Sequence, residues 1–124
     1  MKNYFILISL LFCLQFGFAQ SPDAKQLHET AKTFMKQGDH PNAILVLNRA
    51  IQLDPQNIAI IKDLALNYYF QKDNNKALET ISPVLEKNDA DDQCFQITGN
   101  IYKQLNLQKE SEKIYKKGIK KFPQ

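Results

Sequence analysis

The sequence has little of what most kinds of active site require. Among 124 residues there are only four glycines, two cysteines and two histidines, and tryptophan is absent. It contains neither a glycine-rich phosphate loop nor a Ser-His-Asp or Cys-His arrangement of the kind used in nucleophilic catalysis. His28 and His40 lie far apart in the chain, without an acidic partner at metal-ligand spacing. We therefore predict a protein that is not an enzyme and holds neither a metal ion nor a cofactor.

An excess of charge of one sign is also missing. The formal net charge is +3 at pH 7, which is too weak to indicate nucleic acid as a partner. Hydrophobic residues make up 44% of the chain, which predicts a folded protein rather than a disordered one. The longest apolar run, from Tyr4 to Phe18, is shorter than the roughly 20 residues that a membrane-spanning helix needs.

That apolar run is typical of a secretory signal. It follows a short cationic start at Lys2 and ends in the small residues Gly17 and Ala19. Residues 1–19 are therefore predicted to be a signal peptide that is cleaved after Ala19, which would make the protein periplasmic or secreted. The alternative is an uncleaved segment that anchors the chain to a membrane. Lipidation of Cys13 is disfavoured because the large residue Phe12 precedes it.

Cleavage would leave Cys94 as the one cysteine of the mature chain, which excludes an internal disulfide framework. Its position in the first turn of a predicted helix favours a buried apolar role. The alternative is an intermolecular disulfide or a redox-active thiol.

What the sequence does have is a repeated pattern of small and large residues. Its copies follow one another at a constant spacing, as the small residues Ala31, Ala65 and Gly99 show. A period of this length predicts a stack of helix pairs, none of which can bury its own apolar face alone. The matching positions in the three copies are Ala31, Ala65 and Gly99; Phe34, Tyr68 and Tyr102; Ala43, Ala77 and Ser111; Ala50, Val84 and Gly118; and Pro55, Asp89 and Pro123.

The pattern divides the chain after the signal into a short lead-in, residues 20–23, and three units, residues 24–57, 58–91 and 92–124. Each unit is predicted to form two helices of about 12 to 14 residues, joined by loops of two to four residues, so that neighbouring helices run antiparallel. Pro83 lies inside the second helix of the second unit. We expect a kink or a loosened turn there, because proline lacks a backbone donor and pushes against the carbonyl of Glu79.

These repeats resemble the tetratricopeptide repeat. The resemblance rests on Leu27-x-x-x-Ala31-x-x-Phe34, on Ala43-x-x-x-Leu47-x-x-Ala50, and on their two echoes. It implies an all-α fold, a right-handed superhelical stack of three antiparallel helix pairs. The chain departs from the family in lacking its usual tryptophan, and in carrying Asp89 where the second unit would end in proline.

The family also implies a concave groove, lined by the first helix of each unit, that receives a peptide or a partner helix. A partner with an acidic end and an apolar anchor would suit the mixture of side chains on this face. The alternative is that these positions are solvated or pack adjacent repeats. The groove residues so implied are Lys25, His28, Lys32, Lys36, Lys62, Leu66, Tyr69, Phe70, Gln93, Gln96, Asn100 and Lys103.

One subtype of the family is disfavoured. Its chaperone-binding members hold a C-terminal carboxylate with two lysines, two asparagines and an arginine. Here the matching positions are His28, Lys32, Asp63, Gln93 and Ile97, and Asp63 would repel such a ligand.

The last unit raises further possibilities. No capping helix is predicted after it, so Ile114, Tyr115 and Ile119 are expected to face nothing. An envelope or secreted adaptor is the leading hypothesis. The alternatives are the structural start of a longer array or sensor, and a homodimer formed through this last unit. Its second helix is rich in lysine, which indicates either a solvated outer face or contact with anionic lipid or an acidic partner.

Overall fold

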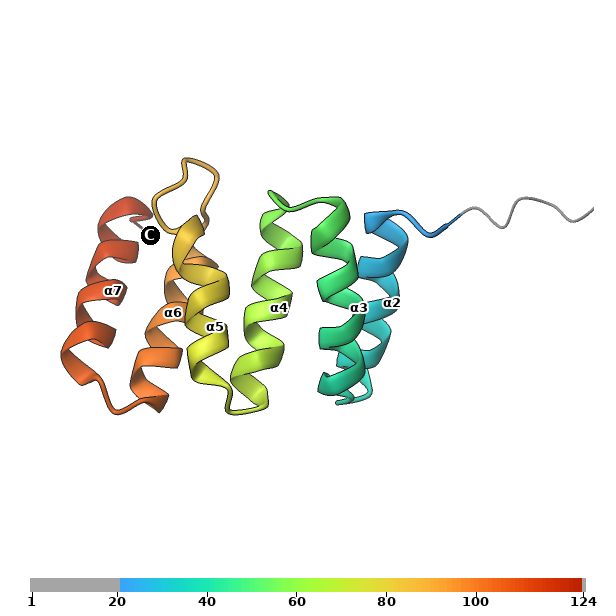
Figure 1. The fold of residues 1–124 in the computed structure, drawn as a ribbon. Coiled ribbons are helices and arrows are strands. Elements are labelled where there is room, and N and C mark those ends of the chain that lie inside the picture. Colours follow the sequence, from blue (N-terminus) through green and yellow to red (C-terminus); the bar gives the residue numbers. More distant parts are fainter. Residues whose placement is uncertain (1–20, 124) are drawn as a thin grey trace, which may run out of the picture.

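The computed structural model describes residues 21–123, so the predicted signal peptide and Cys13 lie outside the described residues. The described chain is all α-helical apart from a short 3₁₀ turn, and its helices stand side by side in chain order (Figure 1). The prediction of three antiparallel helix pairs is confirmed. The elements are α2 (Ala24–Lys36), α3 (His40–Leu53), α4 (Ile58–Phe70), α5 (Asn74–Ile81), η2 (Ser82–Val84), α6 (Asp92–Gln104) and α7 (Gln108–Lys121).

Short polar side chains start five of the helices. Asp23 accepts a hydrogen bond from the Gln26 amide at 2.8 Å, and Asp39, Asn57, Asp73 and Asp91 cap α3, α4, α5 and α6 in the same way. These contacts satisfy backbone donors that have no partner within the helix. Between the two helices of each unit, the turn places one residue at positive φ: Gly38, Lys72 and Asn106. These three residues occupy the same position of the repeat, so the turn recurs with the sequence.

The recurring small residues lie where the two helices of a pair meet. Ala31, Ala43, Ala65 and Ala77 are fully buried, and larger side chains would push the helices apart. In the last unit these positions are Gly99 and Ser111, and the Ser111 hydroxyl donates to the Gly99 carbonyl at 2.9 Å. Close helix packing is therefore the physical reason for this part of the repeat.

The second unit differs from its neighbours because of Pro83. Helix α5 has only eight residues, and it passes into the 3₁₀ turn that contains this proline. The loosened turn expected at Pro83 is present, but the full-length helix and the short loop predicted for this unit were wrong. Residues 85–91 form a longer loop, which lies beside the C-terminal end of α7 (Figure 1). Val84 and Leu85 nevertheless remain buried in the core.

Candidate functional site

The first helices of the three units are joined by polar contacts along the predicted groove side. His28 of α2 donates from Nε2 to the Asp63 carboxylate of α4 at 2.6 Å. Lys62 of α4 donates to the Asp91 carboxylate at 2.5 Å and to the Gln93 side-chain oxygen at 2.8 Å, both at the start of α6. These contacts place matching faces of α2, α4 and α6 next to one another, so the face runs across all three units.

Four of the predicted groove residues are largely engaged within the fold. His28 is only 8% exposed, and the Lys62 side chain is also mostly covered. Leu66 and Tyr69 are half-buried and pack against the core. This placement agrees with the alternative that some of these positions pack adjacent repeats, and it leaves them little surface to offer a ligand.

The remaining predicted residues are more accessible. Lys32 is half-buried and pairs with Glu29 at 2.8 Å, an ion pair that lowers the pKa of the Glu29 carboxyl and raises that of the lysine. Phe70 is 53% exposed. The other exposed members of the predicted set are Lys25, Lys36, Gln93, Gln96, Asn100 and Lys103.

Phe70 is held in place by a residue that was not predicted to belong to the groove. Its ring stacks on the His40 ring, with 5.0 Å between the two centroids. The His40 Nδ1 atom donates to the side-chain oxygen of buried Asn67 at 2.8 Å, and Asn67 in turn donates to the Asp63 carbonyl at 2.7 Å. These contacts link α3 to α4. No sequence signal could have found them, because a lone histidine at a helix start has no distinguishing spacing.

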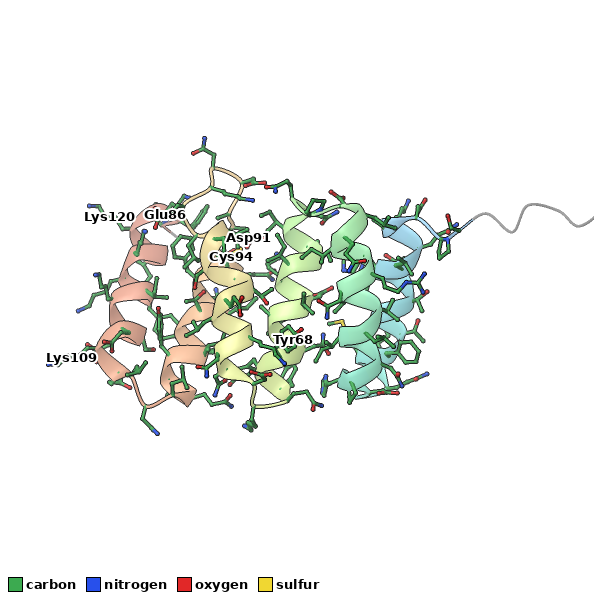
Figure 2. The ribbon with its side chains drawn as sticks, in the orientation of Figure 1. Tyr68, Glu86, Asp91, Cys94, Lys109 and Lys120 are labelled. Atoms are coloured by element: carbon green, nitrogen blue, oxygen red, sulfur yellow. The ribbon has the colours of Figure 1, made fainter. Side chains whose placement is uncertain are left out.

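Cys94 and Asp91 form a small polar cluster at the start of α6 (Figure 2). Cys94 is a fully buried free cysteine, and burial raises the pKa of its thiol to about 11. Burial would also raise the pKa of Asp91, but hydrogen bonds from Lys62 and from the Cys94 thiol and amide hold that pKa below its ordinary value. The cysteine is therefore protonated at neutral pH, which suits the predicted packing role rather than a reactive thiol.

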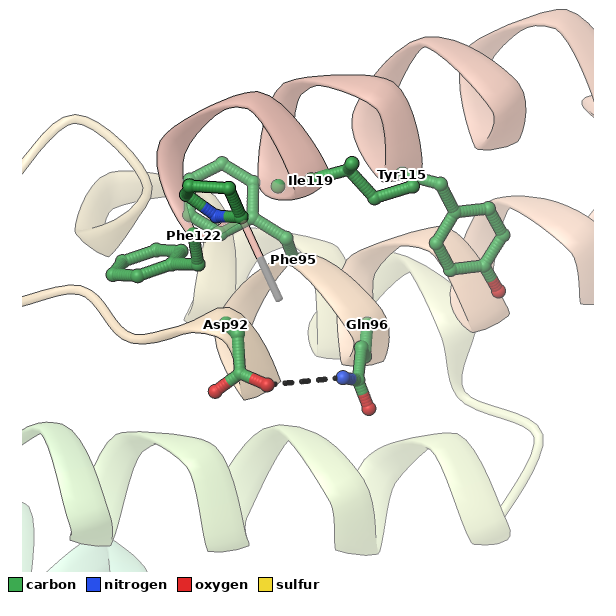
Figure 3. Close-up of a pocket in the computed structure, with 8 residues that line it drawn as sticks. Asp92, Phe95, Gln96, Tyr115, Ile119 and Phe122 are labelled. Atoms are coloured by element: carbon green, nitrogen blue, oxygen red, sulfur yellow. Dashed lines mark hydrogen bonds between the residues drawn. The ribbon is translucent and has the colours of Figure 1, made fainter.

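A concave region lies at the last of the three units, between α6 and α7. It has a volume of about 720 Å³, and Figure 3 shows the side chains around it. Tyr115 and Ile119, which were expected to be uncovered, line this pocket, whereas Ile114 packs against the core. The full lining is Asp92, Phe95, Gln96, Tyr115, Gly118, Ile119, Phe122 and Pro123.

Sequence reasoning missed that this region is a pocket. It placed Gln96 in the groove and assigned no role to Phe95 or Phe122. The available signal was the repeat itself, because the buried residues Ile61 and Leu27 occupy the position of Phe95 in the two earlier units. In the last unit the same position lines the pocket.

Within residues 21–123, no three His, Cys, Asp or Glu side chains lie close enough together to hold a metal ion. Nor is any helix of this described part both long and apolar enough to cross a membrane. The acidic residues at the start of α6 have a structural use, since Asp91 caps the helix and Asp92 accepts a hydrogen bond from Gln96.

Comparison with known proteins agrees with this architecture. The profile of a family described as "Tetratricopeptide repeat" matches residues 34–101. No curated protein matches the chain.

Three solved structures have the same fold. The first TPR of Spaghetti (RPAP3), bound to the HSP90 peptide SRMEEVD, is 22% identical, with a TM-score of 0.76 over 84% of this chain and 82% of that one. The first TPR domain of human RPAP3 is 22% identical, with a TM-score of 0.74 over 81% and 79%. The Sgt2 TPR domain from Aspergillus fumigatus is 19% identical, with a TM-score of 0.74 over 84% and 69%.

Proposed function

The chain belongs to the tetratricopeptide-repeat family, and from that premise we propose that it is a non-enzymatic adaptor. Its ligand would be an extended peptide or a helix of a partner protein, bound on the groove side of α2, α4 and α6. The observation that carries this proposal is the continuity of that face. His28 connects α2 to α4 and Lys62 connects α4 to α6, so that one ligand could contact all three units.

The exposed residues of this face favour a particular ligand chemistry. Exposed lysines supply positive charge to this face, namely Lys25 and Lys36 on α2 and Lys103 on α6. Phe70, half exposed and fixed by stacking on His40, offers an aromatic surface to an apolar anchor of the ligand. We therefore propose an acidic segment with at least one apolar side chain, since charge complementarity guides association and an aromatic contact contributes affinity.

The chaperone peptide of the structural relative is a useful contrast. SRMEEVD is acidic, and the first TPR of Spaghetti (RPAP3) is seen bound to it. In this chain Asp63 is paired with His28, Gln93 accepts from Lys62, and Ile97 is buried. We propose that these positions do not grip a terminal carboxylate, and that the chain recognises an internal acidic segment instead.

We also propose that the protein acts outside the cytoplasm, as an adaptor of the cell envelope. Support for this comes from the composition of residues 1–19, whose cationic start, apolar run and small residues before Ala19 are typical of a secretory signal.

Binding can be tested with short peptides selected from a displayed library against the full chain. Their affinities would be measured by fluorescence polarisation for the wild type and for a Lys36→Glu, Lys103→Glu variant. Because both lysines are exposed, the substitutions should leave the fold intact while reversing two charges on the groove side. We expect binding to weaken by about tenfold or more, and the loss to shrink at high salt.

The matched control is a Lys109→Glu, Lys113→Glu variant, which makes the same change of charge on exposed positions of α7. It should bind the selected peptides within about twofold of wild type, since long-range effects of exposed charges are screened. SRMEEVD, tested in parallel, should bind more weakly than the selected peptides. Equal losses in the two charge variants would overturn the groove as the binding site.

A further inference from the structure

Exposed lysines form a straight line along α7. They follow one another at steps of three or four residues, a spacing that brings side chains to one side of a helix, and the line is about 16 Å long at 1.5 Å per residue. We call Lys109, Lys113, Lys116 and Lys120 the lysine stripe. Lys109 and Lys120 mark its two ends (Figure 2). Among the described residues, none of the four ammonium groups pairs with a carboxylate.

The repeat shows that this side of the second helix is exposed in every unit. The equivalent positions are Pro41, Leu45, Asn48 and Gln52 in the first unit, and Asn75, Glu79, Ser82 and Glu86 in the second. All are exposed except Asn48, which is partly buried, even though α4 packs against α3 and α6 packs against α5. The lysine stripe therefore lies on the outer face of the stack, and not on the side of α7 that corresponds to the contacts between units.

The charge of this outer face differs between the units, while its exposure does not. The four positions carry no charge in the first unit, two glutamates in the second, and lysine at every place in the third. Two neighbouring carboxylates already have partners, because Glu86 accepts from Lys117 at 2.5 Å and Glu112 accepts from Gln108 at 3.4 Å. The fold of the repeat is thus compatible with any of these side chains and does not require the lysines.

The stripe also does not help α7 to fold. Lys109 and Lys113 are four residues apart, as are Lys116 and Lys120, and like charges at this spacing destabilise a helix. Lys109 lies in the first turn, where the helix dipole disfavours a positive charge, and within the stripe only Lys120 lies in the last turn, where it is favoured. Neither packing nor helix stability accounts for four lysines in line, whereas a bound anionic surface would neutralise their repulsion.

We propose that the lysine stripe binds the surface of an anionic phospholipid bilayer. The stripe contains no apolar or aromatic side chain, and folded protein partners depend on such anchors for affinity. A bilayer surface that carries anionic phosphate groups attracts lysines without an anchor, and each lysine near it adds to the binding. Because the stripe is straight and lies on an outer face, a flat surface can contact its whole length.

Nucleic acid fits the same charges less well. The one arginine of the chain, the residue type that most often reads a base edge, is Arg49 on α3. The stripe also has no aromatic side chain on which a base could stack. A lipid surface requires neither feature, so it is the partner that the composition of the stripe favours.

The test measures co-sedimentation of the full chain with vesicles of two compositions. One is phosphatidylcholine alone, and the other contains equal parts of phosphatidylcholine and phosphatidylglycerol. The ratio of the two affinities removes any contribution that the apolar residues 4–18 make to both. For the wild type at physiological ionic strength we expect this ratio to be about tenfold or more, because each lysine near an anionic surface strengthens binding several-fold, and we expect it to fall as salt is added.

Two variants change the stripe at different places. Lys109→Glu with Lys113→Glu alters its first half, and Lys116→Glu with Lys120→Glu alters its second half. Each variant should lower the ratio by about tenfold, because a flat surface contacts both halves. Circular dichroism spectra like that of the wild type would show that both variants are folded, as expected for changes at exposed positions.

The matched control is the Lys36→Glu, Lys103→Glu variant, which changes the net charge by the same amount on the groove side. Its ratio should stay within about twofold of the wild type although its peptide binding is weakened, and this reversal separates the proposal from the proposed function. Equal losses in the stripe and groove variants, or equal affinity of the wild type for the two kinds of vesicle, would overturn the lipid site. A short DNA duplex or polyglutamate that bound the stripe more tightly than the vesicles would assign it to another partner and would likewise overturn it.

Discussion

At Gly118 the backbone of α7 lies directly against the base of the Phe95 side chain on α6. A Cβ atom at this position would lie 2.7 Å from the Cβ of Phe95, closer than real Cβ atoms approach one another. Phe95 is 1% exposed and its Cβ moves only with the backbone of its helix. At Gly99, by contrast, an added Cβ would meet the outer end of the Tyr115 ring. That ring is half-buried and can swing outward. A side chain at Gly118 is therefore blocked by a fixed atom, whereas one at Gly99 is opposed by a movable ring.

We therefore predict that Gly118→Ala is more destabilising than Gly99→Ala. Overpacking costs about 1–3 kcal/mol, while alanine gains up to about 1 kcal/mol over glycine inside a helix. Gly118→Ala should lower the free energy of unfolding by about 1–2 kcal/mol, whereas the same change at Gly99 should alter it by less than about 1 kcal/mol. Urea denaturation followed by circular dichroism measures both values. A larger loss at Gly99 would show that Tyr115 cannot move as described.

The pairing of helices within a unit depends on small side chains at their crossing. Ala31 of α2 and Ala43 of α3 are both fully buried in one apolar cluster. A larger side chain at Ala31 has no exposed direction in which to turn, since the same cluster surrounds it. The helices would have to separate, which would also loosen their contacts with α4.

Accordingly, Ala31→Leu should lower the free energy of unfolding by about 1–3 kcal/mol, even though leucine forms helices well. The control is Thr33→Leu, which places the same side chain on the exposed side of the same helix, and its effect should stay within about 0.5 kcal/mol. Thermal and urea unfolding of the two variants would provide the comparison. Equal losses would mean that leucine content, rather than the crossing, determines the stability of α2.

At the scale of whole elements, the repeat predicted where the helices begin, which local helix propensity alone could not. The first helices begin at Ala24, Ile58 and Asp92, the residues at which the repeat itself begins each unit. The length of α5 was wrong because the apolar spacing continues through Val84 and Leu85, and these residues stay buried after the helix ends at Ile81. The apolar pattern continues there because its residues are buried, but the α-helix does not continue because Pro83 interrupts it.

The groove was harder to predict than the fold. Helical spacing identifies which residues share a face, and Lys62 and Leu66, four positions apart on α4, are such a pair. It cannot show that Lys62 reaches Asp91 in the loop before α6, or that His28 reaches Asp63. Such contacts depend on how one unit sits against the next. These contacts occupy polar groups that would otherwise be free to bind a ligand. Fewer of the predicted groove residues are therefore accessible to a ligand.

Across the whole molecule, stability is shared between the units and the interfaces that join them. Lys62 is central to the second interface, because its one ammonium group binds both Asp91 and Gln93 at the start of α6. The pKa of Asp91 lies below its ordinary 3.8 in the folded chain. Its ionised form therefore stabilises the fold at neutral pH, and this stabilisation is lost as the pH falls below 3.8 through the folded pKa.

Removing this lysine should uncouple the last unit from the rest. For Lys62→Met, which keeps an unbranched apolar stem but removes the ammonium group, we expect the interface to weaken by about 1 kcal/mol, because Asp91 remains partly hydrated. Hydrogen exchange should accelerate several-fold in α6 and α7 while α2 and α3 change little, since opening at one interface releases only the units beyond it. Lys76→Met, which breaks the exposed pair with Asp73 inside the second unit, is the control and should leave this gradient unchanged. Uniform acceleration along the chain in Lys62→Met would instead mean that the three units unfold together.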